Sequence, residues 1–388
     1  MPRIVFIAGE ASGDQLGRGL IEALRSRFPD AVFEGITGPQ MRAAGCESWG
    51  DYDQLAVMGL FEVIKHLPRL LRLKKDLVER LRQDPPDVLI GIDAPDFNLR
   101  LEKLARGIGI PTVHYVCPSV WAWRQSRVKT IRKSCDLVLC LLPFERDFVA
   151  KHDVNACFVG HPLADEIPAE IDQQAARDKF SLGPGPVVAL LPGSRVGELE
   201  RLGDVFLEAA SWLRERLPDV TFISAAASAK TGRLFQQQID NAGLGSHVQL
   251  ETGQVRDVMA AADAVLVASG TATLETMLMQ RPMVVAYKIA PLTAWLARAT
   301  RILKIDFFSM PNLLAGRELV PEILQEEVTG AALGQALLAQ LQDGEERTAL
   351  LSEFRELGSM LRKSASERGA EAVANLLATR PAGRSKQS

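Results

Sequence analysis

The sequence predicts an α/β protein of two domains, each a mostly parallel sheet with helices on both faces, that face each other across a cleft. Three observations support this fold class. The 388 residues are too many for one compact core and suit two domains of ordinary size. Short apolar runs alternate with longer helical patterns, as is typical of parallel sheets covered by helices. A proline-rich stretch interrupts this alternation near mid-chain, and the same pattern then starts again.

In the amino-terminal half, six apolar runs are expected to form strands. They are Ile4–Ala8, Val32–Thr37, Val88–Ile92, Thr112–Val116, Leu137–Leu141 and a short run at Cys157–Gly160. Helices are expected between them, for example at Gln15–Arg27 and Leu70–Arg82. Gly and Pro residues mark several of the junctions, which supports this division into elements.

The domain boundary is expected across His161–Pro186, which contains four prolines. Five further strands are expected at Val187–Leu191, Thr221–Ala225, Val248–Leu250, Ala264–Val267 and Met283–Ala286, with helices such as Glu198–Leu217 and Thr271–Gln280 between them. The predicted division is therefore a first domain at 1–165, a second at 186–344, and a segment at 345–388. That last segment is expected to be a helix at Glu345–Thr379 that packs back, followed by a frayed tail.

Composition excludes several classes of protein. A net charge of -3 argues against a dedicated nucleic-acid binder, and the aromatic and basic run Trp121–Lys133 is too short to change this. Five cysteines without a C-x-x-C pair and five scattered histidines suggest neither a disulfide scaffold nor a metal site, so no metal and no cofactor are expected. The first strand starts at once and no apolar run is long enough to span a bilayer. A reduced, cytoplasmic protein is predicted, which lies on a membrane if it meets one.

A glycine-containing turn joins the first strand to the first helix and includes Glu10, Ser12, Gly13 and Asp14. Small residues let the backbone approach a ligand, and a helix start offers free N–H groups. The turn does not match the dinucleotide fingerprint G-x-G-x-x-G. A purely structural role remains an equal alternative.

The second domain repeats this arrangement with Gly193, Ser194 and Arg195 after its first strand. An arginine that follows a glycine turn can grip a diphosphate with several N–H donors. The alternative is an exposed arginine in a surface ion pair.

A second candidate phosphate loop runs from Ser269 through Gly270 and Thr271 to Thr273 and Glu275. A buried strand ends here and a helix begins, so its partly positive N-terminus is expected to face the cleft. Glu275 lies about one turn into the helix, where it can accept hydrogen bonds from ribose hydroxyls. It can equally be an ordinary first-turn acid.

Asp93, Asp96 and Asn98 follow the apolar strand Val88–Ile92. A carboxylate at the end of a buried strand points into the cleft, where it can act as a general base. Asp93 is the preferred base, because the sequence around Asp96 resembles a helix start. The choice between the two aspartates stays open at this stage.

A basic amphipathic patch is expected between Leu60 and Arg82. Its members are Val63, Ile64, Leu67, Arg69, Leu70, Leu71, Arg72 and Lys74. Such a surface can settle on anionic headgroups, with each basic residue contributing on the order of 1 kcal/mol. Pro68 predicts a kink or a second helix start. A core helix with a solvated face is the alternative, and the same doubt applies to a second mixed patch at Trp295–Lys304.

Six segments of the chain resemble the lipid-A-disaccharide synthase family of inverting glycosyltransferases. They are GEASGD (Gly9–Asp14), GIDAPDFN (Gly91–Asn98), PSVWAWR (Pro118–Arg124), LPGSR (Leu191–Arg195), ASGTATLE (Ala268–Glu275) and MPNLLAGRELVPE (Met310–Glu322). They occur in order over most of the chain, and each is long enough to be specific. The resemblance implies the GT-B fold, in which two Rossmann-like domains face each other across a cleft.

The resemblance also implies a reaction and its partners. UDP-2,3-diacylglucosamine would donate its sugar to the 6-hydroxyl of 2,3-diacylglucosamine 1-phosphate, with UDP leaving, at the anionic surface of the inner membrane. On this interpretation Asp93 is the base, Arg195 and the amides at Gly270–Thr271 stabilise the leaving diphosphate, and Asn312 contacts the nucleotide or the donor sugar. The first domain would then be the acceptor side and the second the UDP-sugar side. A homodimer is possible, but the sequence does not determine the oligomeric state.

Two other classes remain open. A UDP-sugar epimerase can share the fold, but it would need further acid and base groups. A non-catalytic peripheral membrane module would bind a nucleotide without turnover, and Asp93 counts against it.

Overall fold

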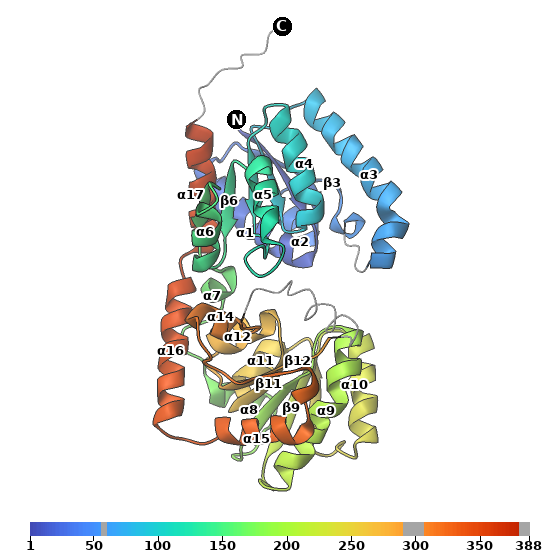
Figure 1. The fold of residues 1–388 in the computed structure, drawn as a ribbon, viewed down its shortest axis with the longest axis vertical. Coiled ribbons are helices and arrows are strands. Elements are labelled where there is room, and N and C mark those ends of the chain that lie inside the picture. The colour runs from blue at the N-terminus through green and yellow to red at the C-terminus, as the bar shows by residue number, and fades with distance from the viewer. Residues whose placement is uncertain (56–59, 290–305, 380–388) are drawn as a thin grey trace. The chain divides into compact units, whose positions relative to one another are not determined.

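The computed structural model describes residues 1–55, 60–289 and 306–379, and the backbone alone of residues 60–66. The chain divides into two compact units (Figure 1). Unit 1 consists of residues 1–165 and the segment from Leu361 onward, and unit 2 is Glu166–Met360. The second expected patch, at 295–304, and the expected tail, at 381–388, lie outside the described residues.

Unit 1 is built on a parallel sheet of seven strands. They are β1 (Arg3–Ala8), β2 (Val32–Thr37), β3 (Glu47–Asp51), β4 (Val88–Ile92), β5 (Thr112–Tyr115), β6 (Leu137–Cys140) and β7 (Ala156–Phe158). Their order is β3-β2-β1-β4-β5-β6-β7, and each neighbouring pair is parallel. The chain therefore adds β2 and β3 on one side of β1, and it then adds β4 to β7 on the other side of β1. This change of direction makes the β1/β4 pair the switch point of the sheet.

The connections of unit 1 are mainly helical. Its elements are α1 (Ala11–Arg27), α2 (Pro39–Ala43), η1 (Tyr52–Gln54), α3 (Leu60–Gln83), α4 (Pro95–Gly107), η2 (Gln125–Arg127), α5 (Val128–Ser134), α6 (Pro143–Ala150), α7 (Pro162–Glu166) and α17 (Ala365–Ala378). The last helix, α17, packs against the first, α1. Glycines allow this close approach, because a Cβ at Gly19 would lie 2.5 Å from the Ser366 hydroxyl oxygen.

Unit 2 has a parallel sheet of six strands. They are β8 (Val187–Leu191), β9 (Thr221–Ala226), β10 (Val248–Thr252), β11 (Ala264–Ala268), β12 (Met283–Tyr287) and β13 (Glu322–Leu324), in the order β10-β9-β8-β11-β12-β13. The helices are α8 (Gln173–Lys179), α9 (Val196–Arg214), α10 (Ala229–Asn241), α11 (Val255–Ala261), α12 (Thr271–Leu278), α14 (Met310–Ala315), η3 (Gln325–Glu327), α15 (Gly330–Gln340) and α16 (Glu345–Leu361). The switch point of this sheet is the β8/β11 pair.

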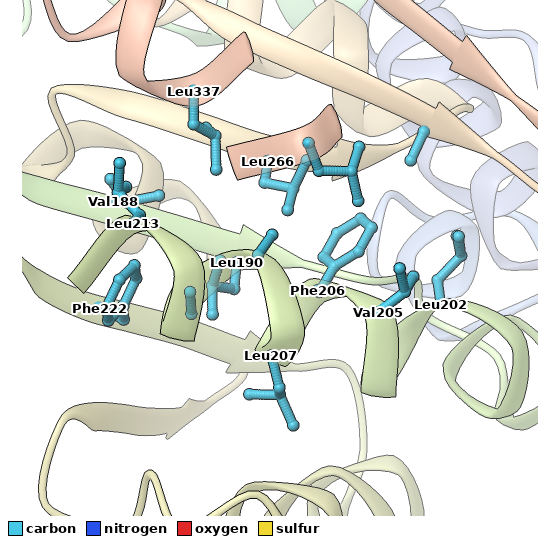
Figure 2. Packing of buried hydrophobic residues seen from close by; sticks show 14 of the residues in the cluster. Val188, Leu190, Leu202, Val205, Phe206, Leu207, Leu213, Phe222, Leu266 and Leu337 are labelled. Carbon is cyan, nitrogen blue, oxygen red and sulfur yellow. The ribbon is translucent and has the colours of Figure 1, made fainter. Parts of the chain in front are cut away.

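The core of unit 2 lies where α9 and α15 cover the sheet (Figure 2). Figure 2 shows Phe206 of α9 among side chains of the central strands, including Leu190 and Leu266, with Leu337 of α15 nearby. All four residues have 0% exposed surface. Burial of this kind contributes about 25 cal/mol per Å² of apolar surface, and it fixes the strands whose ends carry the loops described below.

The sequence located eleven strands and missed two. β3 was missed because its sequence, ESWGD, is mostly polar, and β13 because it has only three residues. The helix α1 begins at Ala11, four residues earlier than expected, so Ser12 to Asp14 belong to its first turn.

The structure differs from two expectations about helices. Of the two alternatives for Pro68, a second helix start is wrong, because Pro68 lies within the single helix α3, at an exposed position where solvent can hydrate the carbonyl that loses its partner. The carboxy-terminal segment is two helices, because Ser364 adopts a left-handed conformation with φ of 54°. The Asp165 carboxylate accepts hydrogen bonds from the backbone N–H groups of Ser364 and Ala365, and so fixes the start of α17.

Candidate active site

The loops after β1 and β4 meet at the switch point of unit 1. A Cβ at Gly9 would lie 2.3 Å from the Cβ of Ala94, so only glycine permits the two loops to approach this closely. Asp93 and Ala94 both have positive φ, of 53° and 43°. Two consecutive non-glycine residues in the left-handed region are a costly conformation, which is often kept at a functional site.

Asn98 holds this strained loop in place. Its side-chain nitrogen donates hydrogen bonds to the carbonyl oxygens of Ile7, Ile92 and Asp93, at 3.1, 3.2 and 2.8 Å. Asn98 has 0% exposed surface and therefore anchors the ends of β1 and β4. The backbone of Asp93 is also tied to β5, because its N–H donates to the Tyr115 carbonyl at 2.9 Å.

The Asp93 carboxyl is half-buried beside the carboxylate of Glu10. Burial raises the pKa of Asp93 above its usual range, and the negative charge of Glu10 raises it further, while His114 opposes this. Glu10 in turn accepts a hydrogen bond from the Ser12 hydroxyl. Asp93, Glu10 and Ser12 thus form one polar cluster at the switch point.

Asp96 and Asp14 have different surroundings from Asp93. The Asp96 side chain is 81% exposed and forms an ion pair with Arg127 at 2.5 Å. Asp14 is buried and accepts hydrogen bonds from the backbone N–H groups of Gly38, Gln40 and Met41 at 2.9 to 3.0 Å. Asp14 therefore anchors the start of α2. Gly13, which precedes Asp14 in the first turn of α1, is buried against Ile92 and Ala8.

In unit 2, the loops after β8 and β11 line a cavity of about 470 Å³. The residues predicted from the sequence that line it are Gly193, Ser194, Arg195, Ser269, Gly270, Thr271 and Glu275. No side chain caps the N-terminus of α12, which begins at Thr271. The positive end of this helix dipole is thus open to the cavity, as an anion-binding site requires.

Sequence reasoning missed Glu198 in this cavity. Its carboxylate accepts hydrogen bonds from the backbone N–H groups of Ser194 and Arg195, at 2.9 and 3.2 Å, and pairs with the Arg195 guanidinium at 3.1 Å. A Cβ at Gly193, which has a φ of 132°, would lie 2.5 Å from the Cβ of Glu198. An acid at the third position of a helix, three residues after the N-cap residue, is a capping signal that the sequence displays. The Arg195 side chain is 64% exposed, so it has room to turn toward a ligand.

The cavity wall also includes small residues from other strand ends, which sequence reasoning did not single out. They are Ala225 and Ala226 at the end of β9, Ala227 after it, and Gly253 after β10. The rule that ligands bind at the carboxyl ends of parallel strands would have found them. Glu275 is already paired, because it accepts a hydrogen bond from Arg256 at 3.1 Å, and Arg256 also pairs with Glu166.

Two predicted nucleotide-binding residues, Thr273 and Asn312, do not line the cavity. Both have 0% exposed surface. The Thr273 hydroxyl donates to the Gly270 carbonyl at 2.8 Å and accepts from the Met310 N–H at 3.1 Å. The Ser269 hydroxyl similarly donates to the Phe308 carbonyl at 2.8 Å. These hydroxyls join the loop after β11 to the segment that starts α14.

Asn312 uses its whole amide inside the protein. Its nitrogen donates to the Val320 carbonyl and to the Glu322 carboxylate, at 2.9 and 2.8 Å. Its oxygen accepts from the N–H groups of Leu319 and Val320, at 2.7 and 2.9 Å. Glu322 also accepts from Phe308 and Ser309. The conformation in this structure gives Asn312 an anchoring position instead of a contact with the cavity.

Two buried clusters of potential metal-ligating groups occur among the described residues. They are Glu102 with His114 and Cys135, and Cys117 with Cys140 and Glu145. In the first, the polar atoms bond one another, since His114 Nδ1 lies 2.7 Å from Glu102 Oε1 and the Cys135 thiol donates to Glu102 Oε2 at 3.2 Å. Burial raises the pKa of the Cys135 thiol well above its usual value, which disfavours the thiolate that binds metals. Neither cluster lines the cavity of unit 2.

The predicted amphipathic patch lies on α3. Leu67 and Leu71 are 41% and 47% exposed, while Leu70 is half-buried and packs against the core of unit 1. Arg69 and Arg72 are exposed and Lys74 is half-buried. The side chains of Val63 and Ile64 lie outside the described residues. Among the described residues, no helix combines the length and the apolar character needed to cross a bilayer.

Solved structures share this two-unit fold. The calicheamicin glycosyltransferase CalG4 matches with a TM-score of 0.59 at 18% identity, over 99% of this chain and 100% of that chain. The UDP-GlcNAc 2-epimerase of Neisseria meningitidis, bound to UDP-GlcNAc, matches with a TM-score of 0.60 at 10% identity, over 97% and 100%. Both comparisons support the fold alone. The chain has the GT-B fold of glycosyltransferases, with a polar cluster at one switch point and an anion-type cavity at the other.

Comparisons of sequence identify the family. The protein-family model described as lipid-A-disaccharide synthetase matches residues 4–375. Lipid-A-disaccharide synthase from Xanthomonas campestris is 51% identical over 98% of this chain and 88% of its own length, and that from Alkalilimnicola ehrlichii is 50% identical over 96% and 97%. The chain belongs to the lipid-A-disaccharide synthetase family. It is an enzyme of the glycosyltransferase class, and this family membership favours a transferase over an epimerase.

The anchoring position of Asn312 makes a prediction about stability. Asn312→Ala removes four hydrogen bonds and leaves buried N–H and C=O groups without partners, so the free energy of unfolding should fall by about 3 kcal/mol. Urea unfolding followed by circular dichroism measures the change. Asn241→Ala, at an exposed position on α10, is the control and should change it by about 0.5 kcal/mol or less. An Asn312→Ala protein as stable as the control would contradict the anchoring role.

Proposed function

We propose that the protein transfers 2,3-diacylglucosamine from UDP-2,3-diacylglucosamine to the 6-hydroxyl of 2,3-diacylglucosamine 1-phosphate. The products are UDP and the β-1,6-linked disaccharide 1-phosphate, and the anomeric carbon is inverted. Family membership over residues 4–375 supports the reaction. The single structural observation that carries it is the cavity at the β8/β11 switch point, where an uncapped helix N-terminus and Arg195 face one space.

In this proposal unit 2 holds the donor. The diphosphate lies against the N–H groups at Gly270–Thr271, and the Arg195 guanidinium turns from Glu198 toward it. The bond between the anomeric carbon and the diphosphate oxygen breaks as negative charge grows on that oxygen. Helix dipoles and a guanidinium stabilise this charge without reorganising solvent. Glu275 lines the cavity, and its carboxylate would accept hydrogen bonds from ribose hydroxyls in addition to the one from Arg256.

Unit 1 supplies the base in this proposal. The Asp93 carboxylate takes the proton of the acceptor 6-hydroxyl while its oxygen forms the new bond to the anomeric carbon. A carboxylate whose pKa is raised by burial is a stronger base than an exposed one. Asp96 is the weaker candidate, because it is exposed and already paired with Arg127. Glu10 and Ser12 lie beside Asp93 and would orient it.

Two substitutions separate catalysis from donor binding. Asp93→Asn should lower the rate of transfer by about 100-fold or more, because a positioned base contributes at least this factor, and should leave the Kd for UDP within about twofold. Arg195→Ala should raise the Kd for UDP about tenfold, because it removes charge-assisted hydrogen bonds to the diphosphate. The measurements are UDP release with both acylated substrates and a chelator present, and calorimetric titration with UDP.

Arg233→Ala, at an exposed position on α10 outside the cavity, is the control for lost positive charge and should bind UDP normally. Transfer at the wild-type rate by Asp93→Asn would remove this residue as the base. Unchanged UDP affinity in Arg195→Ala would remove the arginine from the donor site.

The neighbouring carboxyl groups of Asp93 and Glu10 lead to a prediction about the pH dependence of the reaction. A base works only when deprotonated, so kcat/KM should fall as the pH falls through the raised pKa of Asp93. Glu10→Gln removes the neighbouring negative charge, which lowers the pKa of Asp93 and should move this acid limb to lower pH. Glu22→Gln, at an exposed position on α1, the helix that follows Glu10, is the matched control. An acid limb at the same pH in all three proteins would show that Glu10 does not act on the titrating group.

The protein also associates with the anionic surface of the inner membrane from the cytoplasmic side, in this proposal. Leu67 and Leu71 would enter the headgroup region, with Arg69 and Arg72 beside anionic lipids. Two other exposed apolar residues, Leu104 and Trp123, belong to the same unit.

Vesicle partitioning tests this association. Leu67→Ser with Leu71→Ser should lower binding to vesicles that contain anionic phospholipid by about tenfold or more, because the double substitution removes two apolar side chains from the contact. Leu70 is left unchanged, since it supports the core. The control is Val32→Ser, which alters a 43% exposed residue on β2. Equal loss of binding in both proteins, or none in either, would place the membrane contact elsewhere.

A further inference from the structure

Two adjoining pockets open on unit 1 beside the loop that carries Asp93. The first is apolar, has a volume of about 520 Å³ and is lined by Leu67, Leu70 and Leu71 of α3 and by Phe97 of α4. The second has a volume of about 300 Å³ and is lined by three arginines, Arg100, Arg124 and Arg127. Both pockets share Pro95, Asp96 and Arg100, so they meet along the first turns of α4.

The charge of the second pocket, here called the arginine pocket, is unbalanced. Its three guanidinium groups face one carboxylate, that of Asp96, which pairs with Arg127 at 2.5 Å. The Arg124 guanidinium carbon lies 4.6 Å from the centroid of the Trp123 ring, a contact that brings no negative charge to it. The Arg100 guanidinium has no hydrogen-bonding or ion-pair partner in the part of the chain that the structure describes. The excess of two positive charges matches a phosphate monoester, which carries about -1.5 to -2 near neutral pH.

We infer that the arginine pocket binds the phosphate of the acylated acceptor, while the apolar pocket next to it takes an acyl chain of the same molecule. This inference rests on the proposed function and adds a site to it. Guanidinium groups suit a phosphate because their N–H donors match its oxygens in pairs. An apolar pocket that continues into a cationic one fits an amphiphile whose acyl chain and phosphate are parts of one molecule.

The position of the pockets relative to Asp93 agrees with the shape of the acceptor. Ala94, the next residue after Asp93, lines the apolar pocket. Arg100 lies five residues into α4 from Pro95, which is about 7.5 Å along the helix axis. In the acceptor, the 6-hydroxyl and the 1-phosphate are carried by different carbons, C6 and C1, so the two groups can contact different parts of the protein. A phosphate held at Arg100 therefore leaves the hydroxyl free to face the base.

A membrane phospholipid offers a similar headgroup, but its phosphate is a diester with a single charge. The excess charge of the arginine pocket favours the monoester. The location of the arginine pocket also favours the acceptor over a membrane phospholipid, because the pocket adjoins the loop that carries the candidate base Asp93. We therefore assign it to the acceptor, and the test distinguishes the two sources of phosphate.

The test is the dependence of the transfer rate on acceptor concentration, in micelles of a neutral detergent without anionic lipid. Arg100→Ala should raise the KM for the acceptor about 10- to 100-fold, as expected for a lost charge-assisted hydrogen bond. The kcat and the KM for the donor should stay within about twofold. Arg100→Lys, which keeps the charge but not the paired donors, should restore part of the affinity.

Lys103→Ala is the matched control, because it removes one positive charge from an exposed position of the same helix outside both pockets. It should leave the KM for the acceptor unchanged. A second acceptor that lacks the phosphate should be used equally poorly by the wild type and by Arg100→Ala, because the interaction under test is then absent from both.

Each opposing result has a separate meaning. An active Arg100→Ala enzyme with a normal KM for the acceptor, or one that behaves like Lys103→Ala, overturns this inference and leaves the proposed function intact. An effect of Arg100→Ala that occurs only with anionic vesicles assigns the pocket to membrane lipid and likewise overturns it. A wild-type protein that transfers no sugar to the acylated acceptor overturns the proposed function and this inference together.

Discussion

The polar cluster of unit 1 and the cavity of unit 2 depend on the same constraint, which is that parallel strands bring their carboxyl ends to the same edge of a sheet. At a switch point the neighbouring connections leave in opposite directions, and the loops after two central strands are left side by side. In unit 1 these are the loops after β1 and β4, and in unit 2 those after β8 and β11. Glu10 and Asp93 are 83 positions apart in the chain, yet they meet for this reason. The same constraint brings Arg195 and Gly270 to one cavity.

The polar residues near the two switch points divide into those that hold the loops and those that face a ligand space. Asn98 and Asn312 hold loops, because they satisfy backbone groups that strand ends and helix starts leave open, and Glu198 does this from the wall of the cavity. Arg195 and Glu275 line the cavity itself. This division explains why the motifs are longer than a set of contact residues would require. A loop that must keep its geometry after a substrate binds needs both kinds of residue.

The fold was largely predictable from the sequence, because the central strands of each sheet are short, fully apolar runs separated by helical patterns. β4 and β8 have the bounds that the sequence predicts. The strands β3 and β13 were not predictable, since β3 is mostly polar and β13 has only three residues. For the site, the sequence identified loops but not the direction of side chains. Asn312 and Thr273 lie in the right motifs and turn inward, because backbone carbonyls and N–H groups nearby lacked partners. Only the three-dimensional structure contains that information.

The arrangement of unit 1 also explains an otherwise unfavourable surface. Exposed leucine and tryptophan side chains are costly in water when they gather, and a protein keeps them where a partner covers them. Leu67 and Leu71 serve two purposes in our proposals, since they line the apolar pocket and lie on the face that meets the membrane. An acylated acceptor would then pass from the bilayer into the pocket without exposing its chains to water. The transfer of each methylene into water costs about 0.8 kcal/mol, so a path that avoids water lowers the barrier to substrate entry by many times this amount. In these proposals, the chemistry of the substrate accounts for the exposed apolar side chains of α3, and the chemistry of the reaction accounts for the position of Asp93.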